Sequence, residues 1–329
     1  MGVKFLSVAS ALPMRRVDNG ELAKTLGLDE AAITSRAVTS ERRYVGGDET
    51  GAKLLATASD GALARAGRTR EQVQAIVAST VTPDHQFPGN AAFLQKEWAL
   101  PGAAILDARA CDGGFLHSLD VARTFIDAGT FDLVLLAACD LFSTYLRHER
   151  AGAAVTPWFG DGAATCLLAR SDDDSGILAL EVGNDPTNLE AFWAKDPGTY
   201  LRPRMTRETI ENGLWHFTID MDAMARETAR LMPAICRRAL ERAGLGASDV
   251  SLFIPSAILP EWGAAVADEL GIPRDRIAAT HEGIGYCGTA LLPINIERAL
   301  QSGRLKGGDV ILAASVGAGI AFGAMVYRV

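Results

Sequence analysis

The 329-residue sequence has few cysteines and no long apolar run. Its five cysteines are dispersed and form no Cys-x-x-Cys pair, which excludes a disulfide framework and a zinc cluster and predicts a reduced, cytoplasmic protein. No apolar run reaches the roughly 18 residues of a membrane span, and the N-terminus lacks a basic segment followed by an apolar one. The net charge of −8 excludes a general nucleic-acid binder and a protein that binds anionic membranes.

What is present suits a soluble α/β protein with one large or two fused domains. Apolar runs predict strands at 2–11, 73–81, 103–106, 131–138, 163–169, 177–182, 251–255, 310–315 and 320–329. Helical patterns fall at 52–66, 90–98, 115–126, 219–243, 261–270 and 287–300. We expect strand 103–106 to be buried and strand 177–182 to form a hairpin with 163–169. Residues 185–215, which contain three prolines, predict a long loop or cap.

The two halves of the chain contain similar segments in the same order. VQAIVAST (73–80) and VSLFIPSA (250–257) each follow a helical pattern, and DGAATCLLAR (161–170) and AGIAFGAMVYR (318–328) each follow a Gly-rich turn. A duplicated unit, with halves at 1–170 and 171–329 packed sheet to sheet, explains this repetition, and a shared site would lie at their junction.

One cysteine, Cys111, stands where an expected strand turns sharply into a helix. The turn would expose the thiol, and the positive potential of a helix N-terminus favours the thiolate. Gly113 and Gly114 would let backbone or substrate approach closely. The pattern indicates either a nucleophile or a buried structural cysteine.

Several segments, in this order and spacing, resemble the ketoacyl-ACP synthase III branch of the thiolase fold. They are TPDHQFP (82–88), ACDGGF (110–115), WFGDGAA (158–164) and VGAGIAFGAMVYRV (316–329). The resemblance implies a five-layer αβαβα homodimer in which Cys111 accepts an acyl group from a thioester. It also implies an oxyanion hole formed by the backbone N–H groups of Cys111 and Ala318.

The resemblance suggests further binding roles. Gly317 and Gly319 would let the backbone around Ala318 approach the acyl carbonyl. Phe87 matches a residue that reaches the pocket of the neighbouring subunit, and Arg36 matches an arginine that contacts coenzyme A (CoA). No resident cofactor or metal is implied; acyl-CoA or an acyl carrier protein would supply the thioester.

The sequence departs from the family at two members of its Cys-His-Asn triad, because Ser256 and Tyr286 fall at the His and Asn positions. Serine and tyrosine donate hydrogen bonds but do not transfer protons near neutral pH as imidazole does. Losing one such donor costs about 10²–10³ in rate, which argues against efficient decarboxylating condensation. His216 and His85 are candidate replacement bases, and an ordinary surface or core histidine is the alternative for each.

The donor site also departs from the family. Ala31 and Ala32 occupy the region of the adenine-stacking Trp, and Glu261 replaces a phosphate-binding Arg, so a carrier protein is as plausible a donor as CoA. Arg42 and Arg43 are candidate phosphate contacts. Beside the nucleophile, Arg109 either pairs with Asp112 or binds a substrate carboxylate.

Three functions stay open. The preferred one is an acyltransferase of specialised, polyketide-type metabolism, in which acyl-Cys111 passes its acyl group to an acceptor. The others are a decarboxylating carbon–carbon condensation and a non-catalytic subunit that pairs with an active homologue.

Overall fold

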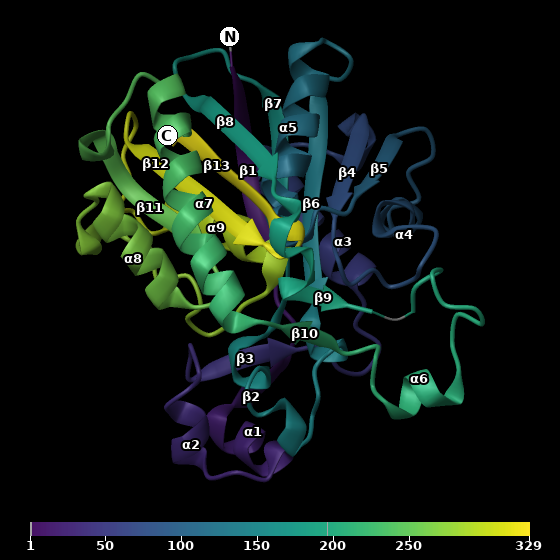
Figure 1. Ribbon diagram of the computed structural model, residues 1–329. Helices are drawn as coiled ribbons and strands as arrows, with labels where there is room; N and C mark the ends of the chain where they lie inside the picture. The colour runs from purple at the N-terminus through teal and green to yellow at the C-terminus, as the bar shows by residue number, and fades with distance from the viewer. Residues whose placement is uncertain (1, 196) are drawn as a thin grey trace.

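Figure 1 shows the computed structural model, which describes residues 2–195 and 197–329. Two β-sheets form the centre of the molecule. The first sheet has the strand order β1 (Val3–Ala11), β7 (Asp161–Arg170), β6 (Leu133–Leu141), β4 (Ala75–Ser79) and β5 (Ala104–Ala108). The second has the order β11 (Val250–Ser256), β12 (Val310–Gly317), β13 (Ala321–Arg328) and β8 (Gly176–Asn184).

Helices separate and cover the sheets in five layers. Helices α5 (Gly114–Asp127) and α9 (Leu291–Gln301) lie between the sheets, where Phe115 and Ile296 are fully buried. Helices α3 (Gly51–Ala66) and α4 (Asn90–Glu97) cover the outer face of the first sheet, and α7 (Met221–Arg242) and α8 (Pro260–Leu270) that of the second. The αβαβα layering expected from the sequence is confirmed.

The two sheets share most of one strand order. Read from β8, the second sheet repeats the order of the first sheet read from β1 and lacks only the outermost strand. At the place of that strand, a single parallel bridge joins Phe253 of β11 to Ile277.

Smaller elements flank this frame. Strands β2 (Arg15–Asp18) and β3 (Glu41–Tyr44) pair beside helices α1 (Asn19–Leu26) and α2 (Glu30–Thr34). The segment expected as a loop or cap extends to residue 219, and this cap (185–219) contains β9 (Phe192–Ala194), α6 (Arg207–Glu211) and β10 (Phe217–Ile219), with β9 paired to β10. Within the described residues, no helix combines the length and apolar character needed to cross a membrane.

The expected hairpin between strands 163–169 and 177–182 is wrong. Strand β7 pairs with β1 on one side and β6 on the other, while β8 pairs with β13 in the second sheet. Because both edges of β7 are occupied, the chain crosses to the second sheet immediately after it.

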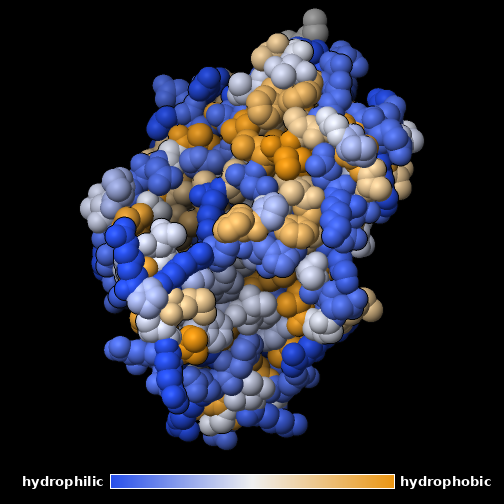
Figure 2. All heavy atoms as spheres, turned by 90° about the vertical axis from the view of Figure 1, so that its right-hand side faces the viewer, coloured by the Kyte–Doolittle hydropathy of each residue, from blue (hydrophilic) through white to orange (hydrophobic). Residues whose placement is uncertain are grey.

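The expected burial of strand 103–106 is also wrong. The strand forms as β5, but it is the edge of the first sheet and pairs only with β4. Its side chains Ile105 and Leu106 are 43% and 39% exposed. Figure 2, which faces the β5 side of the molecule, shows apolar side chains gathered there. An apolar run alone does not distinguish a central strand from the edge strand of a sheet.

Candidate active site

Cys111 lies in the sharp turn that joins β5 to α5. Its φ of 48° is in the left-handed region, which costs a non-glycine residue roughly 1–2 kcal/mol. Two glycines then open the helix. A Cβ on Gly114 would lie 2.5 Å from the Ser79 hydroxyl, and one on Gly113 would lie 3.0 Å from Ala321. These glycines therefore let the helix start pack closely against both sheets.

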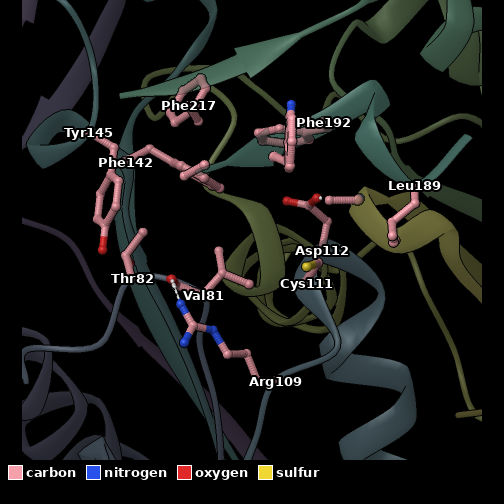
Figure 3. Close-up of a pocket in the computed structure, with 14 residues that line it drawn as sticks. Val81, Thr82, Arg109, Cys111, Asp112, Phe142, Tyr145, Leu189, Phe192 and Phe217 are labelled. Carbon is pink, nitrogen blue, oxygen red and sulfur yellow. Dashed lines mark hydrogen bonds between the residues drawn. The ribbon is translucent and has the colours of Figure 1, made fainter. Parts of the chain in front are cut away.

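The Cys111 side chain lines a cavity of about 360 Å³ (Figure 3). The wall is largely apolar, and the cap contributes much of it through β9 and β10; its aromatic rings belong to Phe142, Tyr145, Phe192, Trp193 and Phe217. Ala318 and Gly319, from the turn after β12, line the same cavity. Cys111 is a partly exposed residue that lines this cavity, so it does not lie in a sealed apolar interior.

The Asp112 carboxyl group accepts a hydrogen bond from the backbone amide of Ala318. The Ala318 N–H donates to Asp112 Oδ2 at 3.1 Å, and the Ser315 hydroxyl donates to the Asp112 backbone carbonyl at 3.0 Å. A Cβ on Gly317 would lie 2.2 Å from the Asp112 Cβ, so this close packing requires glycine. The amide predicted for the oxyanion hole thus lies beside the nucleophile but binds a carboxyl oxygen.

A second buried carboxyl group, Asp140 at the end of β6, lies near Asp112. It accepts hydrogen bonds from the backbone N–H groups of Val81 and Thr289, each at 2.8 Å, and from two threonine hydroxyls. Burial raises the pKa of Asp112. Burial and the charge of Asp112 raise the pKa of Asp140 to about 7. The two buried carboxyl groups therefore hold their protons to a higher pH than exposed carboxyl groups do.

The thiol does not have the acidity that the sequence suggested. Burial, followed by the charges of Asp112 and Asp140, raises the pKa of Cys111 to about 12, and Arg109 opposes this only in part. The positive potential of the helix N-terminus favours the thiolate, but desolvation and the two carboxyl groups outweigh it.

Ser256 and Tyr286, at the positions of the missing His and Asn, are 1% and 0% exposed and do not line the cavity. Neither hydroxyl has a hydrogen-bond partner in the described part of the chain. The Tyr286 ring packs against Phe142 and Phe159. Its hydroxyl faces Asp112 closely enough to lower the pKa of that carboxyl group, although the contact falls short of hydrogen-bond geometry.

None of the five histidines lines the described cavity. His216 directs Nδ1 to the carbonyl of Tyr145 at 2.9 Å, and its ring lies 3.6 Å from that of Trp215. His85 is exposed and packs against Phe93. The structure thus places neither candidate base at the thiol.

The arginines separate into three environments. Arg109 lines the cavity and donates to the Val81 carbonyl at 3.2 Å, and in the described residues it forms no ion pair with Asp112. Arg36 lines a separate pocket with Trp158 and Glu261. Arg42 is fully buried and donates to one side chain and three backbone carbonyls, so a role in binding phosphate is excluded.

Asp140 and the aromatic rings of the cavity wall were not predicted from the sequence. Asp140 interrupts an otherwise apolar run at 133–142, and a charged residue at the end of a buried strand was the available signal. The aromatic residues gave no such signal, because the cap brings Phe192 and Phe217 over the cavity only in the folded chain.

Two packed sheets with a cysteine at the start of a buried helix define a thiolase-fold protein, and comparison with solved structures agrees. The crystal structure of 3-oxoacyl-[acyl-carrier-protein] synthase III from Aquifex aeolicus VF5 matches with a TM-score of 0.89 and 28% identity over 100% of both chains. The priming β-ketosynthase of the R1128 polyketide pathway matches with a TM-score of 0.89 and 25% identity, covering 99% of this chain and 96% of that one.

Sequence comparisons identify the family within the thiolase fold to which the chain belongs. Residues 106–186 match the profile described as 3-oxoacyl-[acyl-carrier-protein (ACP)] synthase III, and residues 240–329 match its C-terminal profile. The chain is 32% identical to β-ketoacyl-[acyl-carrier-protein] synthase III of Roseiflexus castenholzii over 97% of this chain and 95% of that protein. The protein belongs to the ketoacyl-ACP synthase III family, as its motifs predicted.

Proposed function

We propose that the protein is an acyltransferase of specialised, polyketide-type metabolism. Cys111 takes an acyl group from a thioester and passes it to an acceptor bound in the aromatic cavity. The observation that carries this proposal is the separation of two features: the thiol opens on the cavity, whereas Ser256 and Tyr286 are buried outside its wall.

This separation disfavours the decarboxylating condensation. Decarboxylation of a malonyl thioester leaves an enolate, whose oxygen needs hydrogen-bond donors placed in advance. The two residues at the family's donor positions do not reach the cavity. Acyl transfer to an alcohol or amine needs only the nucleophile, a place for the carbonyl oxygen and a route for the proton.

The cavity, together with the separate pocket that contains Arg36, indicates the kind of substrate. Aromatic walls favour an apolar or aromatic acyl group, and the Arg109 guanidinium is the cation in the cavity wall that could bind a carboxylate. The pocket that contains Arg36 supports a place for the thioester donor. The names of the relatives support an acyl carrier protein as that donor.

The edge strand β5 supports a homodimer. Ile105 and Leu106 expose apolar surface on a strand whose outer edge is unpaired, and Phe87, on the loop before α4, is 81% exposed. A second copy that added its β5 to this edge would cover these side chains and bring Phe87 toward the cavity of the partner.

Mass spectrometry of the purified protein incubated with acyl-CoA and acyl-carrier-protein thioesters tests the function. We expect a mass increase equal to one acyl group, located by peptide mapping at Cys111. The increase should be lost in Cys111→Ala and kept in Cys236→Ala, a matched change at a fully buried cysteine that does not line the cavity. Adding an alcohol or amine acceptor should discharge the acyl-enzyme.

Two outcomes would contradict this proposal. Release of CO₂ from a malonyl thioester, with carbon–carbon bond formation, would favour condensation. An absence of any adduct on Cys111 would favour the non-catalytic subunit.

A further inference from the structure

One residue of the cavity wall, Asp112, carries a buried polar atom that has no hydrogen-bond partner within the described residues, and two hydroxyl groups outside the wall share this state. Asp112 Oδ1, the Tyr286 hydroxyl and the Ser256 hydroxyl are all buried, and none has a hydrogen-bond partner in the described residues. Buried polar atoms are rarely left in this state, since each costs about 1–3 kcal/mol. Asp112 is the member of this set that lines the cavity beside the thiol (Figure 3).

Acyl transfer at Cys111 requires a group that accepts the thiol proton, and Asp112 can be that group. The thiol is protonated near neutral pH, and its proton must leave as the sulfur attacks a carbonyl carbon. No histidine of the described chain lines the cavity. Within it, the carboxyl group of Asp112 is the one anionic side chain, and it belongs to the residue next to the nucleophile.

The chain holds this carboxyl group in a fixed position. Oδ2 accepts the Ala318 N–H, the backbone carbonyl of Asp112 accepts the Ser315 hydroxyl, and the missing Cβ of Gly317 leaves room for the side chain. Oδ1 stays unpartnered. These contacts orient one oxygen by binding the other, as a positioned proton acceptor requires.

Resting on the proposed acyltransferase function, we infer that Asp112 is the general base of the reaction, with Tyr286 as the residue that positions its carboxylate. As Cys111 Sγ forms its bond to the acyl carbon, Asp112 Oδ1 takes the thiol proton. When the bond between that carbon and the donor sulfur breaks, the same proton passes to the leaving thiolate. In the second half, Asp112 takes a proton from the acceptor O–H or N–H, and the proton returns to the Cys111 sulfur as its bond to carbon breaks.

The charged and titratable groups around Asp112 determine the pH dependence. They are Cys111 and Arg109 on its own segment, Asp140 at the end of β6, and Tyr286 on the loop before α9. Burial raises the pKa of Tyr286 well above its ordinary value, so its hydroxyl remains a donor. The base acts as carboxylate, so acylation should rise with pH as the Asp112–Asp140 pair, with Asp140 at about 7, loses its proton.

The test compares Asp112→Asn with the wild type by two measurements of Cys111. Single-turnover acylation by the thioester should fall about 10²-fold or more at pH 8, and its rise with pH near 7 should disappear. Alkylation by iodoacetamide should instead become faster, because removing the negative neighbour lowers the pKa of the thiol. A variant that is merely misfolded or blocked would not show opposite changes in the two rates.

Two further variants complete the experiment. Tyr286→Phe removes the donor that favours the carboxylate, so the rise of the acylation rate should move to higher pH. Asp132→Asn, a matched change at an exposed carboxyl group, should leave both rates unchanged.

The outcomes separate the two proposals. Wild-type protein that forms no acyl-Cys111 contradicts the acyltransferase function and the assignment with it. Wild-type acylation with an unaltered rate and pH profile in Asp112→Asn overturns only the assignment of Asp112. An acylation rate that falls, rather than rises, with pH would instead make protonated Asp112 an oxyanion donor.

Discussion

Single residues in this protein have roles that their sequence neighbours do not reveal. Asp112 contacts the Ala318 amide, which lies 206 positions along the chain. Cys111 could be recognised locally, because a strand, a turn and two glycines precede the helix. The acidity of its thiol could not be predicted locally, because Asp140, on a separate strand, raises the pKa of that thiol. Arg42 and Arg36 look alike in the sequence but differ completely in burial.

Arg42 provides a test at this scale. Its guanidinium donates to Asn19 at 2.7 Å and to the carbonyl of Pro157 at 3.1 Å, among other contacts, and it has no solvent exposure. Arg42→Met should lower the free energy of unfolding by about 2–4 kcal/mol, because buried acceptors lose their donor. Urea unfolding measures this loss.

Arg36→Met is the matched control, because the Arg36 side chain is exposed, and it should change stability by less than about 0.5 kcal/mol. Equal stability of the two variants would show that Arg42 does not anchor the fold.

At the scale of elements, most helices and strands could be predicted from apolar runs and helical periodicity. Helix 52–66 and strand 310–315, for example, appear as α3 and β12 with small changes at their ends. The partners of the strands could not be predicted in the same way. Strand β8 pairs with β13, about 140 positions away, and the sequence between β7 and β8 gives no sign of the crossing.

One close contact between elements gives a prediction of its own. Gly160 donates its N–H to the carbonyl of Tyr286 at 2.9 Å, and a Cβ at this position would lie 1.8 Å from the Ile284 carbonyl oxygen. Gly160→Ala must separate the two segments, so we expect a loss of about 2–4 kcal/mol in unfolding free energy.

Gly307→Ala, where nothing lies within 4 Å of the added Cβ, should be neutral or slightly stabilising. Thermal unfolding of the two variants tests the contact, and similar melting temperatures would disprove it.

At the scale of the molecule, the layered architecture followed from the repeated halves and the family motifs. The cavity could not be predicted in this way, because part of its wall comes from the cap, and the irregular sequence of the cap predicts no conformation. The exposure of β5 also lay beyond prediction, since it depends on what covers the edge of the sheet rather than on its apolar residues.

The proposed homodimer gives the prediction at this scale. Ile105→Lys places a charge on the apolar edge of β5 and should convert the dimer into monomers, as light scattering after size-exclusion chromatography would show. Ile210→Lys, on exposed helix α6 of the cap, should leave the mass unchanged. A wild-type protein that elutes as a monomer at micromolar concentration would refute the dimer.

The unequal sheets have a consequence for how many copies can associate. In the described chain, β11 has no full neighbouring strand corresponding to β5, and the bridge from Phe253 to Ile277 takes up its outer side. The described chain therefore offers one such edge rather than two. The proposed pairing along β5 would be self-complementary and would end after a single pairing, so it would not propagate into a filament.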